Sequence, residues 1–436
     1  MRRSEVSRSV TYFDGRPLTN VRRSQSTQEF ISSLPTMQLR NGPLVLGYLR
    51  ELIIESDAVK VRKSRGIEEV VGLNFQHIRS RLTHSEPLRR LDILGAVMSV
   101  PSNNKFWSLS KIMSSHRPES TVLVIQLCLT HFFLDPTIDN SNSYHQEIAG
   151  IPSSQAAAHA DHCRQPVFMG KYKSYANVRW ILSVVRFMRY HFLESGELAG
   201  CYTALEPQLR PQAWVGRLES GTKKLGTHWK GGYIWVQDGQ FVNFRRDPYN
   251  AQIDEESDGL HELSIFHDET AFPSTAWPQQ FETLISTDPF PPSNSPNPLN
   301  VAALRFPLLS FFGTGRDATR PGHLFGRIHG LPLQQGIPGF QRVSFIKFCY
   351  NRAEMNLEFV DTEQIWAYEG CVLPGGRIMV GRWMHVSLDG DVLDPVDRLS
   401  GPFIYWNVDD NRADPPIFPS EALKYKELLR NTGFIN

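Results

Sequence analysis

The fold is decided by the stretch Leu373-Pro-Gly-Gly-Arg-Ile-Met-Val-Gly-Arg-Trp383 near the C-terminus. Two adjacent glycines, Gly375 and Gly376, separate two β-type runs, and glycine readily takes the positive φ that a tight hairpin turn requires. The stretch therefore predicts a β-hairpin. Because side chains alternate along a strand, its second strand has two distinct faces. We expect one face to carry Ile378, Val380 and Arg382, and the other Arg377, Met379, Gly381 and Trp383.

Similar β-type runs, separated by Gly, Pro and Asp turns, recur every ten to twenty residues through the C-terminal half. Seven of the nine tryptophans lie in this half. About nine strands without a strong helical pattern between them favour an antiparallel barrel, with a sandwich as the alternative. The candidate strands are 232–237, 240–246, 260–266, 303–312, 323–329, 342–350, 365–372, 377–383 and 402–408.

The N-terminal half has a different pattern. From Asn41 to about Leu205, apolar residues recur at the spacing of amphipathic helices. In the last helix, Arg179, Arg186 and Arg189 would lie opposite the apolar stripe. The polar segment 135–170 favours a long loop or two short helices. The helical stretches are 45–53, 67–82, 91–98, 121–134 and 178–192.

These patterns predict an α+β protein with an N-terminal helical domain over residues 41–205 and a lipocalin-like antiparallel β-barrel over residues 206–436. Residues 1–40 are rich in Arg and Ser and lack an apolar run, so we expect a disordered basic tail. An acidic, Pro-rich insertion is expected at 247–299, which holds ten acidic residues and no Lys or Arg. Such a run is usually a solvated excursion, and an acidic docking loop for a basic partner is the alternative.

Charge and composition exclude several classes of protein. The net charge of +1 provides no field that would attract nucleic acid or an anionic membrane. The most apolar run, 121–134, is too short to cross a bilayer. The five cysteines are scattered and include no Cys-x-x-Cys pair. We therefore expect a soluble intracellular protein, cytoplasmic or nuclear, that binds neither nucleic acid nor membrane.

The most metal-like cluster is His159-Ala-Asp-His162-Cys163. His, Asp and Cys all bind zinc, but a closed zinc site needs four ligands. We favour polar packing at a helix N-terminus and expect neither a metal nor another cofactor. The chain holds no GxSxG elbow, P-loop, HExxH or kinase motif set, so the sequence identifies no catalytic residue and leaves open whether the chain is an enzyme.

A group of basic and aromatic residues lies in the best-patterned β region. Such side chains could line the mouth of the barrel and hold an anionic group through charge-assisted hydrogen bonds. Arginines that pair with surface acids are the simpler alternative. The candidate ligand- or partner-binding residues are His323, Arg327, Arg377, Arg382 and Trp383.

The same region resembles a known family. Its motifs are Phe311-Phe-Gly-Thr-Gly315, His323-Leu-Phe-Gly-Arg-Ile-His329, Gly336-Ile-Pro-Gly-Phe-Gln-Arg342, Trp366-Ala-Tyr-Glu-Gly370, the Leu373–Trp383 stretch and Gly401-Pro-Phe-Ile-Tyr-Trp406. As a set they resemble the C-terminal region of F-box-type proteins of filamentous fungi. The resemblance implies an F-box-associated β-barrel that follows an N-terminal helical module in the chain.

An F-box itself is not expected. Leu34-Pro35 is similar to the opening of that module, but Asn41-Gly42-Pro43 would break its first helix. Trp107 also lies too far downstream to close it. A direct role in a ubiquitin ligase is therefore not implied.

Two functions are compatible with these observations. The first is a non-enzymatic binding module that recognises a peptide or protein partner through the barrel. The second is an accessory protein that carries, cyclises or isomerises a hydrophobic small molecule in a fungal specialised-metabolite pathway. The barrel interior distinguishes them, because a core filled by side chains favours the first and an open apolar cavity favours the second.

Overall fold

The structure is a computed structural model, and it describes the following residues: 50, 53–54, 59–64, 67–72, 118–137, 144–169, 173–194, 196–214, 217–248, 253–267, 306–316, 321–349, 365–385 and 399–409. The predicted tail at 1–40, most of the helical stretches predicted before residue 99, and the Pro-rich part of the acidic segment lie outside these ranges.

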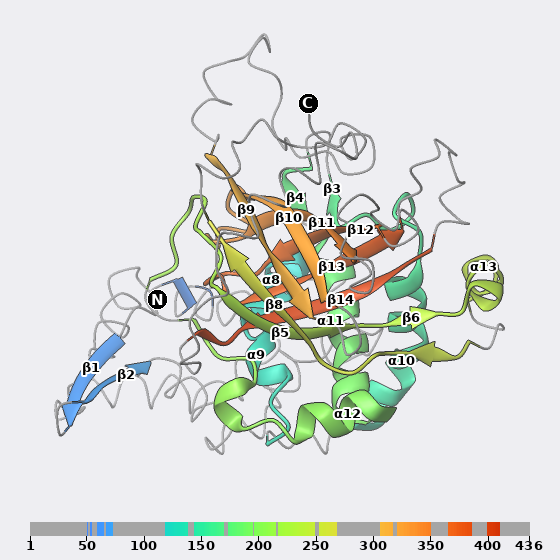
Figure 1. Cartoon of the computed structure of the whole chain (residues 1–436), viewed down its shortest axis with the longest axis horizontal. Helices are drawn as coiled ribbons and strands as arrows, with labels where there is room; N and C mark the ends of the chain where they lie inside the picture. The colour runs from blue at the N-terminus through green and yellow to red at the C-terminus, as the bar shows by residue number, and fades with distance from the viewer. Residues whose placement is uncertain are drawn as a thin grey trace, which may run out of the picture. The chain divides into compact units, whose positions relative to one another are not determined.

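An eight-stranded antiparallel barrel forms the centre of the C-terminal half (Figure 1). Each strand pairs with its neighbours in the order β10-β11-β12-β13-β14-β5-β8-β9, and β9 pairs with β10 to close the barrel. The prediction of an α+β chain with an antiparallel barrel is thus confirmed. The strands are β5 (His228–Tyr233), β8 (His261–Phe266), β9 (Leu308–Arg316), β10 (Pro321–Gly330), β11 (Gln341–Cys349), β12 (Ile365–Val372), β13 (Ile378–His385) and β14 (Ser400–Asn407).

The predicted hairpin joins β12 to β13. Gly375 and Gly376 have φ values of 90° and 74°, the left-handed region in which glycine is preferred. The Leu373 N–H donates to the Ile378 carbonyl at 2.8 Å, which closes the turn. The alternation along β13 is also as predicted, since Met379 and Trp383 belong to the buried interior cluster.

Aromatic and aliphatic side chains fill the barrel. The rings of Phe345 and Tyr368 stack with centroids 4.4 Å apart, and Phe403 meets Tyr368 edge to face at 5.3 Å. Such close packing matches the density of protein interiors. The interior cluster consists of Leu225, Trp229, Leu263, Ile265, Phe311, Leu324, Ile328, Val343, Phe345, Tyr368, Val372, Met379, Trp383, Phe403 and Tyr405.

A pair of glycines makes room for this packing. Gly370 and Gly381 are register partners on β12 and β13. A Cβ atom at Gly370 would lie 2.8 Å from the Phe403 ring, and one at Gly381 would lie 2.2 Å from the Glu369 carbonyl oxygen. Both distances are too short for real contacts, so the Phe403 ring and the close strand pairing require glycine at both positions.

Two helices pack on the outer wall of the barrel beside β13 and β14. They are α11 (Val178–Leu193) and α12 (Gly196–Thr203). Phe192 of α11 stacks on Tyr202 of α12 at 4.7 Å, and both rings meet Trp406 of β14 edge to face at 5.6 Å. These aromatic contacts fix both helices to the barrel.

By chain contacts the protein divides into two compact units. One comprises Met1–Gly150, Ala213–Glu219 and Gln335–Pro338, and it holds helices α8 (Pro118–Cys128) and α9 (Thr130–Phe133). Both helices lie within the predicted stretch or adjoin it, and their described side chains are largely buried, as expected for an all-round apolar run. The other unit holds the barrel together with Ile151–Gln212, so α11 and α12 group with the barrel.

Several predicted elements differ from the structure. The stretch 240–246 belongs to helix α13 (Asp238–Arg246), not to a strand. Its buried residues Phe241 and Phe244 are three apart, which is helical spacing. The segment 135–170 contains the 16-residue helix α10 (Tyr144–His159), because the run Gln155-Ala-Ala-Ala158 favours helix over loop.

Two further predictions are corrected. Ile67–Gly72, predicted as the start of a helix, is strand β2 and pairs with β1 (Val59–Ser64), in keeping with its Ile and Val content. In α11, Arg186 and Arg189 are buried and only Arg179 is exposed, because α11 is covered on more than one face. The acidic segment 247–299 is not a single loop between strands, since it supplies barrel strand β8.

Trp383→Ala is predicted to lower the free energy of unfolding by about 3–5 kcal/mol, the usual cost of truncating a core aromatic residue. Trp383 is 3% exposed and its ring contacts Trp366 at 5.2 Å. Urea unfolding followed by circular dichroism measures the change. Leu333→Ala, at a side chain that is 52% exposed, is the control and should change stability by less than about 0.5 kcal/mol. Equal midpoints for both variants would contradict the interior position of Trp383.

Candidate binding site at the end of helix α10

A pocket of about 270 Å³ lies where α10 ends and α13 passes beside it. Small side chains leave the space on the α10 side, and polar side chains from the turn after α10 form another part of the wall. We call it the α10 pocket. Its lining residues are Ser153, Ala156, Ala157, His159, Ala160, Asp161, Arg164, Gln165, Phe244, Arg245 and Pro248.

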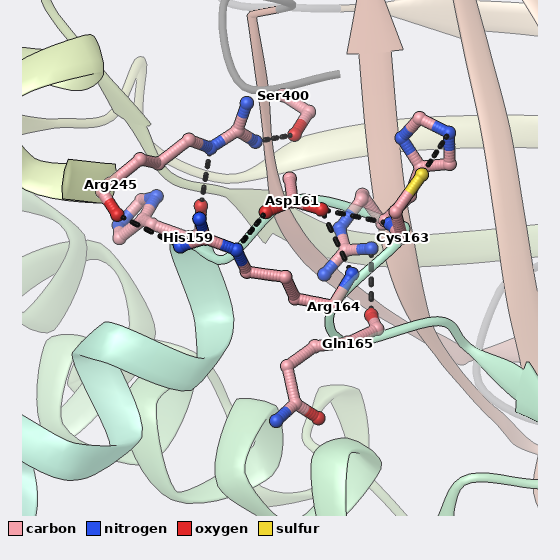
Figure 2. Close-up of polar contacts among 9 residues, drawn as sticks. His159, Asp161, Cys163, Arg164, Gln165, Arg245 and Ser400 are labelled. Carbon is pink, nitrogen blue, oxygen red and sulfur yellow. Dashed lines mark hydrogen bonds and ion pairs between the residues drawn. The ribbon is translucent and has the colours of Figure 1, made fainter.

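Asp161 organises the turn that follows α10 (Figure 2). Its Oδ1 accepts hydrogen bonds from the backbone N–H groups of Cys163 at 3.0 Å and Arg164 at 2.9 Å. Its Oδ2 lies 3.3 Å from Nε of Arg164. An Asp side chain that caps the backbone two and three residues later is a common turn device. The buried carboxylate is therefore satisfied by its own segment.

Arg245, the last residue but one of α13, joins α10 to the barrel. Its Nε donates to the His159 carbonyl oxygen at 2.8 Å, and Nη2 donates to Oγ of Ser400 at 2.6 Å. The guanidinium lies 3.9 Å above the Phe241 ring. In turn, Nη1 of Arg164 lies 3.4 Å from the Arg245 carbonyl oxygen, and both arginines are among the residues that line the pocket.

Behind the pocket wall, a carboxylate bridges two histidines. Glu255 of the short strand β7 (Glu255–Glu256) accepts from Nε2 of His159 on Oε1 and from Nε2 of His191 on Oε2, both at 3.0 Å. Burial lowers the pKa of His159, although Glu255 raises it. Burial alone would raise the pKa of Glu255, but the two histidine hydrogen bonds outweigh it and hold this pKa at about 2. The bridge ties α10 and α11 to β7.

Arg382 holds the same turn from the barrel side. Its Nη1 donates to the Gln165 carbonyl oxygen at 2.8 Å, and its guanidinium lies 4.7 Å above the Trp180 ring. Burial lowers the pKa of Arg382 to about 10, while Glu369 and Asp161 raise it. At neutral pH Arg382 therefore stays charged.

The structure separates the residues that the sequence grouped at a barrel mouth. Trp383 points into the interior, whereas Arg382 and Arg327 are buried on the outer wall. Successive register pairs place Arg327, Ser344, Glu369 and Arg382 in one row across β10 to β13. His323 and Arg377 are half-buried. Of the five predicted residues, only Arg382 reaches the α10 pocket segment, through Gln165.

The metal-like cluster lies at a helix C-terminus, where an N-terminus was predicted. His159 is the last residue of α10, and its ring lies between Phe187 and Phe244. Nε2 of His162 lies 3.6 Å from Sγ of Cys163. Among the described residues, no group of three or more His, Cys, Asp or Glu side chains is arranged to hold a metal ion.

Sequence reasoning missed Arg164, Arg245 and Glu255. One local signal existed, because an Asp two residues before Cys163 and three before Arg164 fits an Asp-capped turn. No local signal pointed to Glu255, which sits in an acidic run and acquires its role only through contacts distant in sequence.

Comparisons with family models, with curated proteins and with solved structures find no match to this chain. Within the described ranges, no helix is both long and apolar enough to cross a membrane.

Glu255→Gln is predicted to lower the free energy of unfolding at pH 7 by roughly 1–3 kcal/mol, because a neutral amide cannot accept from two histidine N–H groups as well as a carboxylate does. Urea unfolding measures the change. The neighbouring Glu256→Gln, which removes the same charge, is the control and should have a much smaller effect. Equal losses in the two variants would contradict the bridge.

Acid should also destabilise the wild-type protein through this bridge. The pKa of Glu255 is depressed, so its contribution is present above about 4.5 and is lost as pH falls toward 2. His159 also has a lowered pKa, so below about 6.5 the unfolded chain takes up a proton that the folded chain does not. Stability should therefore fall from about pH 6.5 downward, and less steeply in Glu255→Gln below pH 4.5. Parallel profiles for the two proteins would contradict this.

Proposed function

We propose that the chain is a non-enzymatic recognition module that binds a peptide or protein partner on the outside of its barrel. The observation that carries the proposal is the packing of the interior, where fifteen buried side chains of the described residues form one cluster. A barrel that encloses a ligand keeps part of its interior for it, and this one uses its interior for core packing. The motifs that resemble F-box-associated barrels support the same function.

The outside of the barrel unit carries an exposed apolar surface suited to a partner. Of the described residues, the exposed large apolar side chains are Met169, Tyr175 and Leu333, which are 44%, 57% and 52% exposed. Met169 and Tyr175 are cross-strand partners on the hairpin of β3 (Phe168–Met169) and β4 (Tyr175–Ala176), so they share one face. We call Met169 and Tyr175, together with Leu333 of the segment whose Gln334 binds the hairpin backbone, the hairpin patch.

The hairpin patch is held firmly from behind. The ring of Phe168, on the opposite face of the hairpin, lies 5.3 Å from the Arg342 guanidinium. Gln334, next to Leu333, accepts from the Ala176 N–H at 3.1 Å and donates to the Ser174 carbonyl oxygen at 3.1 Å. A rigid apolar surface loses little conformational entropy on binding, which favours recognition.

Small-molecule handling is the second candidate, and the α10 pocket is the observation in its favour. At about 270 Å³ the pocket lies just below the usual 300–1,000 Å³ of ligand sites. Its lining includes Arg164, Arg245 and Asp161, a charged wall that suits a polar group better than a hydrophobic metabolite. We therefore favour the protein partner.

The test is quantitative crosslinking and affinity capture with the full chain in extracts of the organism that makes it. The double variant Met169→Ser/Tyr175→Ser should lose most of the enrichment of the partner, because it removes the apolar contact. Arg179→Gln, an exposed change on α11, should retain it. Each recovered protein is then purified. Calorimetry measures its affinity for the wild type, for the double variant and for Arg179→Gln.

Three outcomes would contradict the proposal. Calorimetry that finds no direct binding to any recovered protein would remove the recognition function. Equal affinity of the partner for the double variant and the wild type would show that the hairpin patch is not the contact. A hydrophobic metabolite that copurifies in stoichiometric amount, in the absence of a protein partner, would favour the second candidate.

A further inference from the structure

We infer that the α10 pocket receives an acidic side chain of the partner peptide. The inference rests on the proposed recognition function and deepens it, because it assigns a chemical class to one residue of the partner. It is carried by the size of the pocket, by the charges that border it, and by its place in the chain close to the hairpin patch.

The shape of the pocket suits one side chain. Ala156, Ala157 and Ala160 are the small residues on the α10 side, and the apolar residues Phe244 and Pro248 also line it. A volume of about 270 Å³ holds a single side chain and leaves too little room for a drug-sized molecule. Apolar lining beside polar groups matches the methylene stem and charged tip of a glutamate.

The charges in the pocket favour an anion. The charged residues among its lining are two arginines, Arg164 and Arg245, and one aspartate, Asp161. The Asp161 oxygens are already engaged by two backbone N–H groups and by Nε of Arg164. The exposed guanidinium of Arg164 is therefore the donor that a ligand can reach, and guanidinium binds carboxylate or phosphate oxygens strongly.

Arg164 is the side chain placed to make the contact. It is 64% exposed, and its described bonds use Nε, toward Asp161, and Nη1, toward the Arg245 carbonyl oxygen. This arrangement holds the guanidinium at the pocket while its remaining nitrogen, Nη2, can donate to a ligand. Asp161 thus orients Arg164, and a preoriented donor loses less entropy on binding.

The repulsion of an anion by the end of helix α10 is reduced, because two of its last four carbonyl groups accept hydrogen bonds from side chains. The negative end of a helix dipole arises from the last unsatisfied carbonyls. Here the Ala157 carbonyl accepts from Nε1 of Trp180 at 2.8 Å, and the His159 carbonyl accepts from the charged Nε of Arg245 at 2.8 Å. Because the donor group of Arg245 is a cation, its positive charge offsets the partial negative charge at the helix end.

The pocket and the hairpin patch are close to each other in the chain. Gln165 lines the pocket and Met169 belongs to the patch. These residues are four apart in the chain, so their Cα atoms are separated by at most about 14 Å. An extended peptide covers that distance with about four or five residues. The partner segment is therefore expected to carry an acidic residue about four or five positions from an apolar one.

The test uses two small probes that differ only in charge, N-acetylglutamate amide and N-acetylglutamine amide. Ligand-observed NMR titration of the full chain gives their dissociation constants. We expect the glutamate probe to bind at least tenfold more tightly than the glutamine probe, and to weaken as salt is raised. O-phosphoserine is a third arm, and tighter binding of this probe would assign the pocket to phosphorylated side chains within the same anionic class.

Two variants locate the binding and one controls for charge. Arg164→Gln removes the exposed cation, and Ala156→Leu fills the pocket from the α10 wall, where Ala156 is half-buried. Each should weaken the glutamate probe at least fivefold. Arg179→Gln removes the same charge away from the pocket and should leave the affinity unchanged. Circular dichroism confirms that all variants are folded.

Equal binding of the glutamate and glutamine probes, or unchanged glutamate affinity in both Arg164→Gln and Ala156→Leu, would overturn the inference. Its failure is separable from failure of the proposed function. If the pocket variants leave the affinity of the purified partner unchanged while the double hairpin-patch variant lowers it, the recognition function stands and the acidic residue is ruled out.

Discussion

The close packing of aromatic rings inside the barrel constrains everything else in this protein. The Phe403 ring fits only because Gly370 and Gly381 face each other across two strands without side chains. With these side chains packed in the interior, the proposed partner would meet the outside of the barrel. The outer wall would then have two tasks, because it holds the helices that cover it and would present a surface to that partner.

The buried charges on the outer wall perform the first task. Glu369 accepts from Arg342 and lies 3.5 Å from Nζ of Lys173. Burying charges is unfavourable unless they are paired and hydrogen-bonded, and these groups are partly satisfied by the covering segments. The Lys173–Glu369 pair holds the hairpin, and Arg382 binds the carbonyl of Gln165. These buried charges thus position the turn at Gln165 and the hairpin.

The sequence predicted what depends on local pattern and failed where distant segments meet. The β12–β13 hairpin followed from two glycines and an alternation, and α11 from a single apolar stripe. Helix α13 was missed because a seven-residue stretch with three apolar residues fits a strand as well as a helix, and only the burial of Phe241 and Phe244 decides it. The α10 pocket could not be predicted at all, since Arg164, Arg245 and Ser400 are brought together only by the fold. The spacing of His159 and Cys163 singled these two residues out in the sequence. The neighbouring Arg164, which the sequence did not single out, is the exposed charged residue that lines the α10 pocket.

A recognition surface of this kind would gain its selectivity from geometry more than from strength. One apolar contact or one exposed ion pair contributes little by itself, and many proteins offer either. The turn at Gln165 and the hairpin at Phe168 contact two strands of the barrel that lie on either side of β12, through Arg382 of β13 and Arg342 of β11. The distance between the pocket and the hairpin patch is then set by the barrel. A partner whose acidic and apolar residues had the wrong spacing would leave one of them unbound. A rigid wall would therefore make two weak contacts selective for the correct spacing.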